Sequence, residues 1–167
     1  LLNGRIVLIS DTLVHEWPEQ HDLATIAERA ADVARHLGME PRVAFVSFST
    51  FGYPVSERAQ KMHLAPKVLD ERGVDFEYEG EMTVDVALNP KAQEAYPFQR
   101  LTGPANILVV PARHSASISV KLMQEMAGAT VVGPILAGID KSIQICSTNM
   151  TANDILNMAV LAACKVG

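Results

Sequence analysis

Residues 23–48, LATIAERAADVARHLGMEPRVAFVSF, decide the fold of this chain. Apolar residues recur at helical spacing from Leu23 to Leu37 and form one apolar face. Gly38 and Pro41 mark the end of the predicted helix. Arg42–Phe48 is a nearly continuous apolar run of strand length, which is typical of a strand covered on both faces in a parallel sheet. A helix that leads into such a strand predicts an α/β fold.

The same alternation of strands and helices extends toward both ends of the sequence. Further strands are predicted at Arg5–Ile9, Phe76–Met82, Ile107–Val110, Thr130–Leu136 and Ser142–Cys146. Further helices are predicted at Ser56–Glu71, Ser117–Ala127 and Ala152–Ala163, with a weaker helical pattern over Val84–Tyr96. Elements of these lengths in this order predict a layered αβα architecture around a mostly parallel sheet.

Three segments carry local signals that modify this pattern. Pro66 lies inside a predicted helix, where a proline costs about 3 kcal/mol, so a kink or a break is expected near Ala65. Asn89 and Pro90 interrupt the weak helical pattern. Phe76–Met82 alternates apolar with acidic residues, which favours an exposed edge strand.

Composition and charge exclude several classes of protein. The 167 residues are 49% hydrophobic, which excludes a disordered chain and is enough for one sizeable core in one or two domains. The net charge is -5 and there is no basic run, so a nucleic-acid partner is not expected. No apolar stretch approaches membrane-spanning length and the start lacks a signal-peptide pattern, so we expect a cytoplasmic protein without a membrane partner. Because the sequence opens at Leu1 rather than at a methionine, we expect a piece of a longer polypeptide.

The two cysteines belong to no metal-ligand spacing. Cys146 and Cys164 stand in apolar stretches, which predicts buried, reduced thiols. No metal site is therefore expected in this chain.

Two polar loops follow predicted strands, and ligands of open α/β sheets bind beyond the carboxyl ends of the strands. Ser47–Gly52 offers the hydroxyls of Ser49 and Thr50 to an anion, although turn formation alone also explains this loop. Pro111–Ser117 carries Arg113, whose guanidinium can pair with a phosphate in two-point geometry. The alternative is an ordinary surface arginine. For His114, which follows Arg113, a surface role is favoured even more strongly.

A third loop, Ser147–Thr151, leads into the last predicted helix. Thr151 and Asp154 have the spacing of a capping box, in which the hydroxyl accepts an N–H of the first turn and the carboxylate reaches back. This alternative needs no ligand. From the strand positions alone, the three loops are expected to converge on one site.

The order and wording of these segments resemble a known family. The run from Gly103 to Ala163, which begins GPANILVVP, is similar to the C-terminal part of phosphate acetyltransferases, and the likeness extends through DTLVHEWP (11–18) and PRVAFVSFST (41–50). RGVDFEYEGEMTVDVALNP (72–90) and YPFQRLTGPANILVVP (96–111) look closer still to the phosphotransacetylase-like region that ends bacterial NADP-dependent malic enzymes. The resemblance covers almost the whole chain and implies a phosphate acetyltransferase-like fold, of the isocitrate and isopropylmalate dehydrogenase type.

The resemblance also implies a site. Transacetylases of this family move an acetyl group between coenzyme A and phosphate in a cleft between two α/β domains, with a serine, an adjacent arginine and a downstream aspartate. Matched by position, the serine corresponds to Ser147 and the aspartate to Asp154, but the arginine corresponds to Thr148. Losing one such donor typically costs about 10² to 10³ in rate. The loop that reads roughly DLNAGNI in the family is ARHSASI (112–118) here, so amides and a carboxylate expected there are also missing.

On this resemblance, residues 1–136 form the second domain of a phosphotransacetylase-like region. Residues 137–167 then complete a first domain, most of which lies outside this chain. The final apolar helix, Ala152–Ala163, is expected to pack on more than one side and to be under-packed in this chain, so a homo-oligomer is expected.

The leading hypothesis is a regulatory region of a malic enzyme that binds acetyl-CoA or a related CoA thioester without turnover. No cofactor is expected in this chain, and NADP and a divalent metal are expected in upstream malic enzyme domains. We expect no catalytic residue, and the inherited cleft is expected to be lined by Ser49, Thr50, Arg113, Lys121, Ser147, Thr148 and Asp154. The alternatives are an active phosphate acetyltransferase and a purely oligomerising module.

Overall fold

The computed structural model of this protein describes residues 4–148 and 150–164. In chain order, the described elements are β1 (Leu8–Ser10), α1 (Gln20–His36), β2 (Arg42–Val46), α2 (Glu57–Arg72), β3 (Glu77–Met82), α3 (Val84–Leu88), α4 (Pro90–Gln93), β4 (Ile107–Val109), α5 (Arg113–Ala127) and α6 (Ala152–Ala163). Their alternation confirms the α/β class predicted from the sequence.

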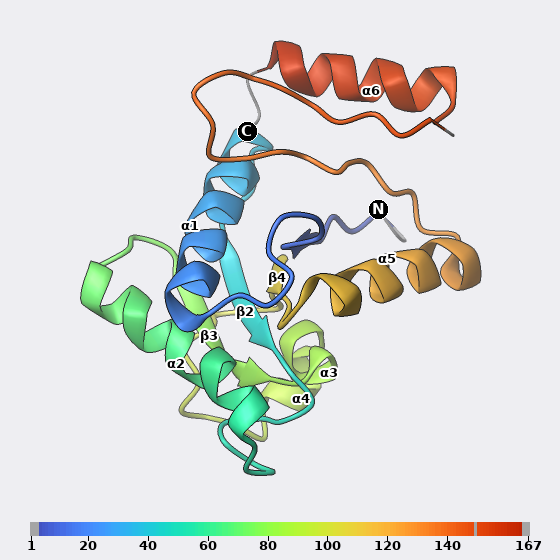
Figure 1. The fold of residues 1–167 in the computed structure, drawn as a ribbon. Helices are drawn as coiled ribbons and strands as arrows, with labels where there is room; N and C mark the ends of the chain where they lie inside the picture. Colours follow the sequence, from blue (N-terminus) through green and yellow to red (C-terminus); the bar gives the residue numbers. More distant parts are fainter. Residues whose placement is uncertain (1–3, 149, 165–167) are drawn as a thin grey trace.

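The strands form one parallel sheet in the order β1-β4-β2-β3 (Figure 1). Alternate residues of β2 point to opposite faces of this sheet. Val43 and Phe45 join a core with α1 and α2, whereas Ala44 and Val46 join a second core with α3 and with Ala116 of α5. The sheet therefore lies between two helical layers, which is the predicted αβα architecture.

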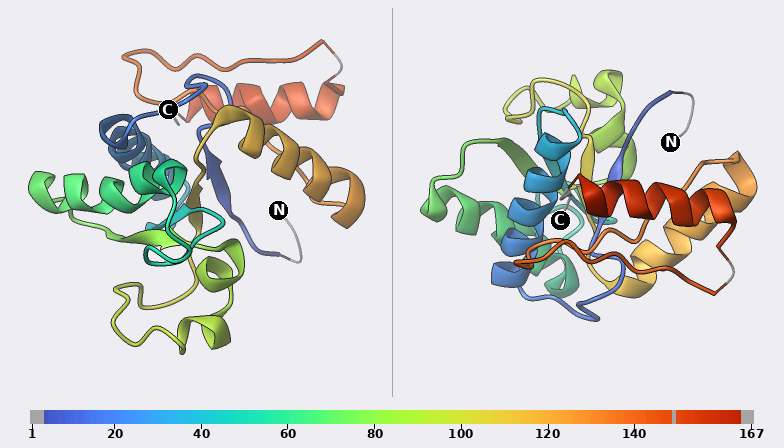
Figure 2. Two further views of the ribbon diagram at one scale, coloured as in Figure 1. Left: turned by 60° about the horizontal axis from the view of Figure 1, so that its bottom comes forward. Right: turned by 90° about the horizontal axis from the view of Figure 1, so that it is seen from above.

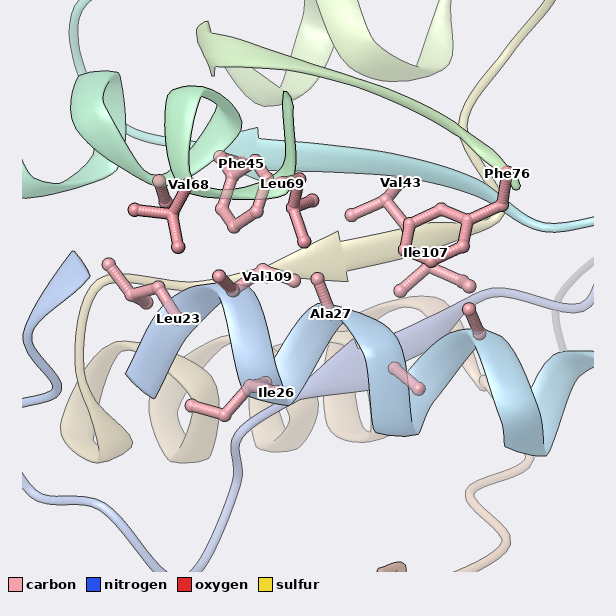
Figure 3. Packing of buried hydrophobic residues seen from close by; sticks show 14 of the residues in the cluster. Leu23, Ile26, Ala27, Val43, Phe45, Val68, Leu69, Phe76, Ile107 and Val109 are labelled. Carbon is pink, nitrogen blue, oxygen red and sulfur yellow. The ribbon is translucent and has the colours of Figure 1, made fainter. Parts of the chain in front are cut away.

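The larger core is built from β2, β4, α1 and α2 (Figure 3). Phe45 of β2 and Leu23 and Ala27 of α1 are completely buried. The small alanines of α1 let its backbone approach the sheet closely, which explains why a helix with many alanines still buries its whole inner face. This packing confirms the apolar stripe that the sequence indicates.

Two predicted strands are absent and one helix begins earlier than predicted. Thr130–Leu136 and Ser142–Cys146 are not strands in the structure, because within the described residues neither segment has a neighbouring strand with which to pair. Helix α5 begins at Arg113 instead of Ser117, and it ends at Gly128, whose left-handed backbone caps it as predicted.

Strand β3 lies at the edge of the sheet as predicted, but its burial differs from the prediction. The last four residues of β3 are buried, and they include Glu79 and Glu81. The exposure predicted from the alternation of acidic and apolar residues is therefore wrong, because the acidic side chains have internal hydrogen-bond partners. The chain also remains helical across Pro66, so the break considered for α2 does not occur.

The chain after α5 extends away from the layers and ends in α6. Figures 1 and 2 show α6 beyond the end of the sheet at which the strands begin, opposite the end at which β2 and β3 lead into their loops. Met158 is buried, whereas Ile155, Leu156 and Val160 are about half exposed. The expected under-packing of this helix is thus present within the described residues.

Both cysteines are free, but they are exposed and not buried. The prediction of burial for Cys146 and Cys164 is therefore wrong. Their apolar neighbours in the sequence belong to the extended segment and to α6, and these have few packing partners in the described part of the chain.

Candidate functional site

The loop after β2 is held by the side chain of Glu81, a residue of β3. The carboxylate of Glu81, which is 1% exposed, accepts hydrogen bonds from the Ser49 hydroxyl (2.8 Å) and the Gly52 backbone N–H (2.7 Å) through one oxygen. Ser49 itself is completely buried. Thr50 is only partly buried, and its hydroxyl lies 3.3 Å from that of Thr83. The groups that the sequence offered to a bound anion are therefore used within the fold.

Glu81 also fixes a histidine. Its second oxygen lies 2.8 Å from Nδ1 of His63, a residue of α2 whose side chain is 39% exposed. This contact leaves Nε2 as the ring nitrogen that Glu81 does not use. The sequence did not indicate this Ser49, Glu81 and His63 cluster, because its members come from three separate elements and match no spacing motif.

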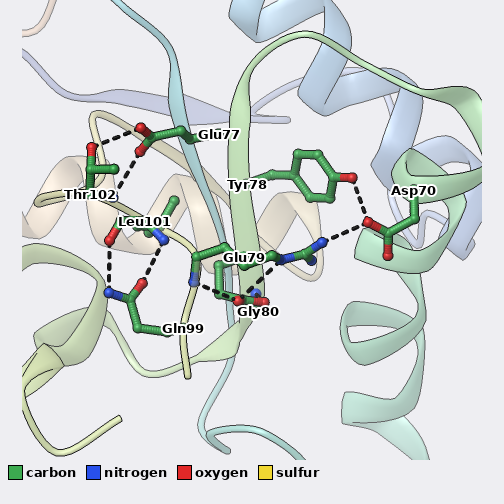
Figure 4. Close-up of polar contacts among 9 residues, drawn as sticks. Asp70, Glu77, Tyr78, Glu79, Gly80, Gln99, Leu101 and Thr102 are labelled. Carbon is green, nitrogen blue, oxygen red and sulfur yellow. Dashed lines mark hydrogen bonds and ion pairs between the residues drawn. The ribbon is translucent and has the colours of Figure 1, made fainter. Parts of the chain in front are cut away.

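The other acidic side chains of β3 hold the segment before β4 in place (Figure 4). Glu77 accepts hydrogen bonds from the backbone and hydroxyl of Thr102, and Glu79 accepts them from the backbone and Nε of Arg100. Arg100 also pairs with Asp70 at 2.6 Å. Burial and the Asp70 carboxylate together raise the pKa of the neighbouring Tyr78 to about 12. These contacts explain the burial of β3 and give it a structural role.

Arg113 and His114 lie in the first turn of α5 and not in a loop. The predicted loop Pro111–Ser117 is wrong in this respect, because the helix begins directly after Ala112. The Arg113 side chain is 47% exposed and lies 4.0 Å from the carboxylate of Glu16. The ring of His114 packs against that of Trp17 in a tilted arrangement, with a centroid distance of 4.9 Å. Lys121 is exposed on the same helix.

The loop that precedes Trp17 is organised by Asp11. Its carboxylate accepts hydrogen bonds from the backbone N–H groups of Leu13, Val14 and His15, and it lies 2.8 Å from Nδ1 of His15. Burial opposes ionisation of Asp11, but these donors outweigh it and lower the pKa of the carboxyl group. The loop therefore depends on the ionised form of Asp11.

This dependence predicts a loss of stability in acid. A carboxyl group whose pKa is lower in the folded state stabilises the fold above its unfolded pKa, about 3.9 for aspartate, and this contribution disappears as the pH falls toward the folded value. We expect the free energy of unfolding to fall below about pH 4, and to fall less steeply in Asp11→Asn. Denaturant unfolding of both proteins between pH 5 and 3 measures this difference. Equal slopes would show that Asp11 does not contribute.

The C-terminal candidates lie around the start of α6. Ser147 and Thr148 are exposed in the segment that leads to this helix. Asp154 forms the predicted capping box with Thr151: the carboxylate accepts hydrogen bonds from the Thr151 hydroxyl (2.7 Å) and backbone N–H (2.9 Å), while the hydroxyl accepts the Asp154 N–H (3.2 Å). The Thr151 hydroxyl and N–H lower the pKa of Asp154.

The capping box predicts a measurable effect on stability. Thr151→Ala removes the acceptor for the Asp154 N–H and one donor to its carboxylate, so we expect a loss of about 0.5 to 2 kcal/mol. Thr151→Ser keeps the hydroxyl and should leave the stability within a few tenths of a kcal/mol of wild type, because serine is at least as favourable an N-cap residue as threonine. Helix content and unfolding midpoints by circular dichroism test this. Identical losses in the two variants would contradict the capping role.

The predicted site residues lie at two ends of the sheet. Ser49 and Thr50 follow the carboxyl end of β2, and Arg113 opens α5 soon after β4. Ser147, Thr148 and Asp154 belong to α6 and the segment before it, and α6 lies beyond the amino ends of the strands (Figures 1 and 2). The expected convergence of three loops is therefore not seen, because the segment before Ser147 is not a strand of this sheet.

The described residues show neither a candidate metal site nor a membrane-spanning helix. Residues 4–148 and 150–164 contain no group of histidine, cysteine, aspartate or glutamate side chains that could hold a metal ion. Among the same residues, no helix has the length and apolar character needed to cross a membrane.

Comparison with known proteins identifies the class. Residues 1–163 match the family described as phosphate acetyl/butaryl transferase, and the chain belongs to this family. A solved structure, EutD phosphotransacetylase from Staphylococcus aureus, is 28% identical and superposes with a TM-score of 0.91 over 100% of this chain and 52% of its own. A phosphate acetyltransferase from Bacillus subtilis is 32% identical over 159 residues, of which this chain covers 49%.

Within that family, the chain matches the phosphotransacetylase-like region of malic enzymes. It is 54% identical over 167 residues to the NADP-dependent malic enzyme of Rhizobium meliloti, and 36% identical over 164 residues to that of Escherichia coli. It spans 22% of the length of each of these relatives. The resemblance to the C-terminal region of malic enzymes that the sequence indicates is thereby confirmed.

Proposed function

We propose that this chain is a regulatory region of an NADP-dependent malic enzyme, which binds acetyl-CoA or a related CoA thioester and does not turn it over. One observation carries the proposal: Thr148 stands at the position at which the resemblance implies an arginine. Acetyl transfer develops negative charge on the carbonyl oxygen, and the attacking phosphate is itself an anion. A threonine hydroxyl cannot supply the positive charge and paired donors of a guanidinium.

The surroundings of the other two positions support the same proposal. The Asp154 carboxylate is used by Thr151, so a proton acceptor at this position would first have to leave its cap. The arginine side chains that the structure describes make contacts elsewhere in the chain. These contacts join Arg5 to Leu88 and Ala105, Arg29 to Asp32, Arg35 to Asp75, Arg42 to Pro104, Arg72 to Glu28, Arg100 to Asp70, and Arg113 to Glu16.

We assign the acyl end of the ligand to Ser147, Thr148 and Asp154. Lys121 and Arg113 are exposed cations and stay candidates for the phosphates, whereas Ser49 and Thr50 are assigned to loop structure because their hydroxyls bond within the fold. In this proposal, NADP, a divalent metal and the malate site belong to upstream parts of the same polypeptide. Residues 137–167 complete a neighbouring domain there, which the half-exposed apolar residues of α6 support.

The test is a titration of the full-length polypeptide with acetyl-CoA while malate oxidation is followed. We expect saturable inhibition, with a coupling of about 1 to 3 kcal/mol, which is a 5- to 150-fold change in apparent affinity. Thr148→Ser keeps the hydroxyl with a small side chain and serves as the matched control, whereas Ser147→Trp should block the effect. Malate turnover that does not respond to acetyl-CoA, together with undetectable acetyl-CoA binding, would refute the proposal.

A working phosphate acetyltransferase is the second candidate. Ser147 and Asp154 are retained, and the chain is 32% identical to the acetyltransferase of Bacillus subtilis. Acetyl phosphate formation by the full-length polypeptide distinguishes this candidate from the first. Turnover that persists in Thr148→Ser and is lost in Asp154→Asn would favour it.

A purely oligomerising module is the third candidate, favoured by the exposed apolar residues of α6. It predicts that Leu156→Ser changes the oligomeric state, measured by light scattering. It also predicts that Ser147→Trp leaves the response to effectors unchanged, which is the opposite of the result expected from the leading proposal.

A further inference from the structure

A cavity of 340 Å³ opens at the amino ends of three neighbouring strands. It is lined by residues 4–6 ahead of β1, by Met39 and Arg42 at the start of β2, and by residues 104–106 ahead of β4. None of the residues predicted to bind a ligand lines it. The amino ends of these strands are at the end of the sheet beyond which α6 lies (Figure 1).

Arg5 and Arg42 both line this cavity, and backbone carbonyls accept hydrogen bonds from both guanidinium groups. Arg5 donates from its two terminal nitrogens to the carbonyls of Leu88 and Ala105, each at 3.2 Å. Arg42 donates from Nε to the carbonyl of Pro104 at 3.0 Å. Among the described residues, the terminal nitrogens of Arg42 have no hydrogen-bond partner, so four N–H donors remain available on a side chain whose orientation is fixed.

The positive charge of this pair is not compensated within the described residues. No acidic residue lines the cavity, and neither Arg5 nor Arg42 forms an ion pair there. This distinguishes them from other described arginines, such as Arg29 and Arg72, which pair with Asp32 and Glu28. Two like charges at one cavity repel each other, and a bound anion removes that repulsion.

We propose that this cavity binds a phosphate group of a phosphorylated small molecule, with Arg42 as the principal contact and Arg5 as the second cation. The planar fork of a guanidinium matches two phosphate oxygens, and its delocalised charge suits a partly desolvated position. The volume is within the range of small-molecule sites and exceeds what one phosphate needs, which favours a ligand that carries its phosphate on a larger body. The proposal does not depend on the proposed function.

Calorimetric titration of the full-length polypeptide with inorganic pyrophosphate tests the site. Arg42→Gln is expected to weaken pyrophosphate binding by 10- to 100-fold and Arg5→Gln by a smaller factor. Arg42→Lys, which keeps the charge but loses the fork, should fall between wild type and Arg42→Gln. Arg29→Gln is the matched control, because it removes an exposed arginine on α1 and should bind as wild type does. Thermal unfolding of each variant confirms that it is folded.

The source of the phosphate is settled by competition. If pyrophosphate and acetyl-CoA displace each other and Arg42→Gln weakens both, the cavity holds a phosphate of the CoA ligand. If pyrophosphate binds but does not compete with acetyl-CoA, the cavity is a separate site for another phosphorylated molecule. The proposal would be overturned if wild type, Arg42→Gln and Arg29→Gln bound pyrophosphate with equal affinity. It would also be overturned if the folded wild type bound no pyrophosphate at concentrations up to about 10 mM.

Discussion

Glu81→Ala is expected to lower the free energy of unfolding by about 3 to 5 kcal/mol. The substitution removes one buried carboxylate that accepts hydrogen bonds from the Ser49 hydroxyl, the Gly52 N–H and the His63 ring. Each donor that loses its partner in a buried place costs about 1 to 3 kcal/mol, and partial access to water reduces the sum. Denaturant unfolding at neutral pH measures the loss.

Glu81→Gln is the matched variant. Its amide oxygen can still accept from Ser49 and Gly52, and its NH₂ group can face Nδ1 of His63 if the imidazole adopts the other tautomer. We therefore expect a loss of only about 1 kcal/mol, the usual net value of a hydrogen bond. A Glu81→Ala loss no greater than that of Glu81→Gln would contradict the role assigned to Glu81 at the carboxyl edge of the sheet.

Gly80→Ala has the second large expected effect. A Cβ atom at this position would lie 2.7 Å from the carbonyl oxygen and 2.8 Å from the Cβ of Phe45, a completely buried residue of the neighbouring strand. The backbone φ of +148° is also one that side chains rarely adopt. Overpacking costs about 1 to 3 kcal/mol and backbone strain about as much again, so we expect a loss of about 3 kcal/mol or more.

Gly73→Ala separates these two causes. Gly73 caps α2 with φ of +65°, and a Cβ there would meet no atom within 4 Å. Only the conformational cost applies, about 1 kcal/mol. Chemical unfolding of both alanine variants gives the comparison. Similar losses at the two positions would mean that contact with Phe45 does not limit the size of residue 80.

The regular elements were predictable because their signals are local. The apolar stripe of α1 and the apolar run of β2 are explained by burial on one face and on two faces respectively. The bounds predicted for α6 agree with the structure, because Thr151 and Asp154 form a capping box whose pattern lies within four consecutive residues.

The predictions that proved wrong depend on contacts between segments that are distant in the sequence. Nothing near Glu81 in the sequence shows that Ser49 and His63 are its partners, so the acidic alternation of β3 gave the wrong exposure. Ser142–Cys146 has strand composition but, among the described residues, no strand beside it. This false strand also led to the expectation that Ser147 would lie at the same edge of the sheet as Ser49. A strand forms only where a partner supplies the ladder.

The arginine cavity could not be predicted for a related reason. Arg5 and Arg42 stand 37 positions apart in the sequence, and they line one cavity because β1 and β2 flank β4 in the sheet order. Nothing in either local stretch distinguishes these arginines from the ion-paired ones. The distinction is the absence of an acidic partner among the described residues, which only the tertiary structure can provide.

The central claim is that this phosphotransacetylase-like region holds a CoA thioester without consuming it. The most direct measurement is incubation of the full-length polypeptide with radiolabelled acetyl-CoA and excess phosphate, followed by separation and quantification of bound acetyl-CoA, free CoA and acetyl phosphate. The account predicts saturable binding from which acetyl-CoA is recovered intact. Steady accumulation of acetyl phosphate with an equal amount of free CoA, abolished by Asp154→Asn, would contradict it.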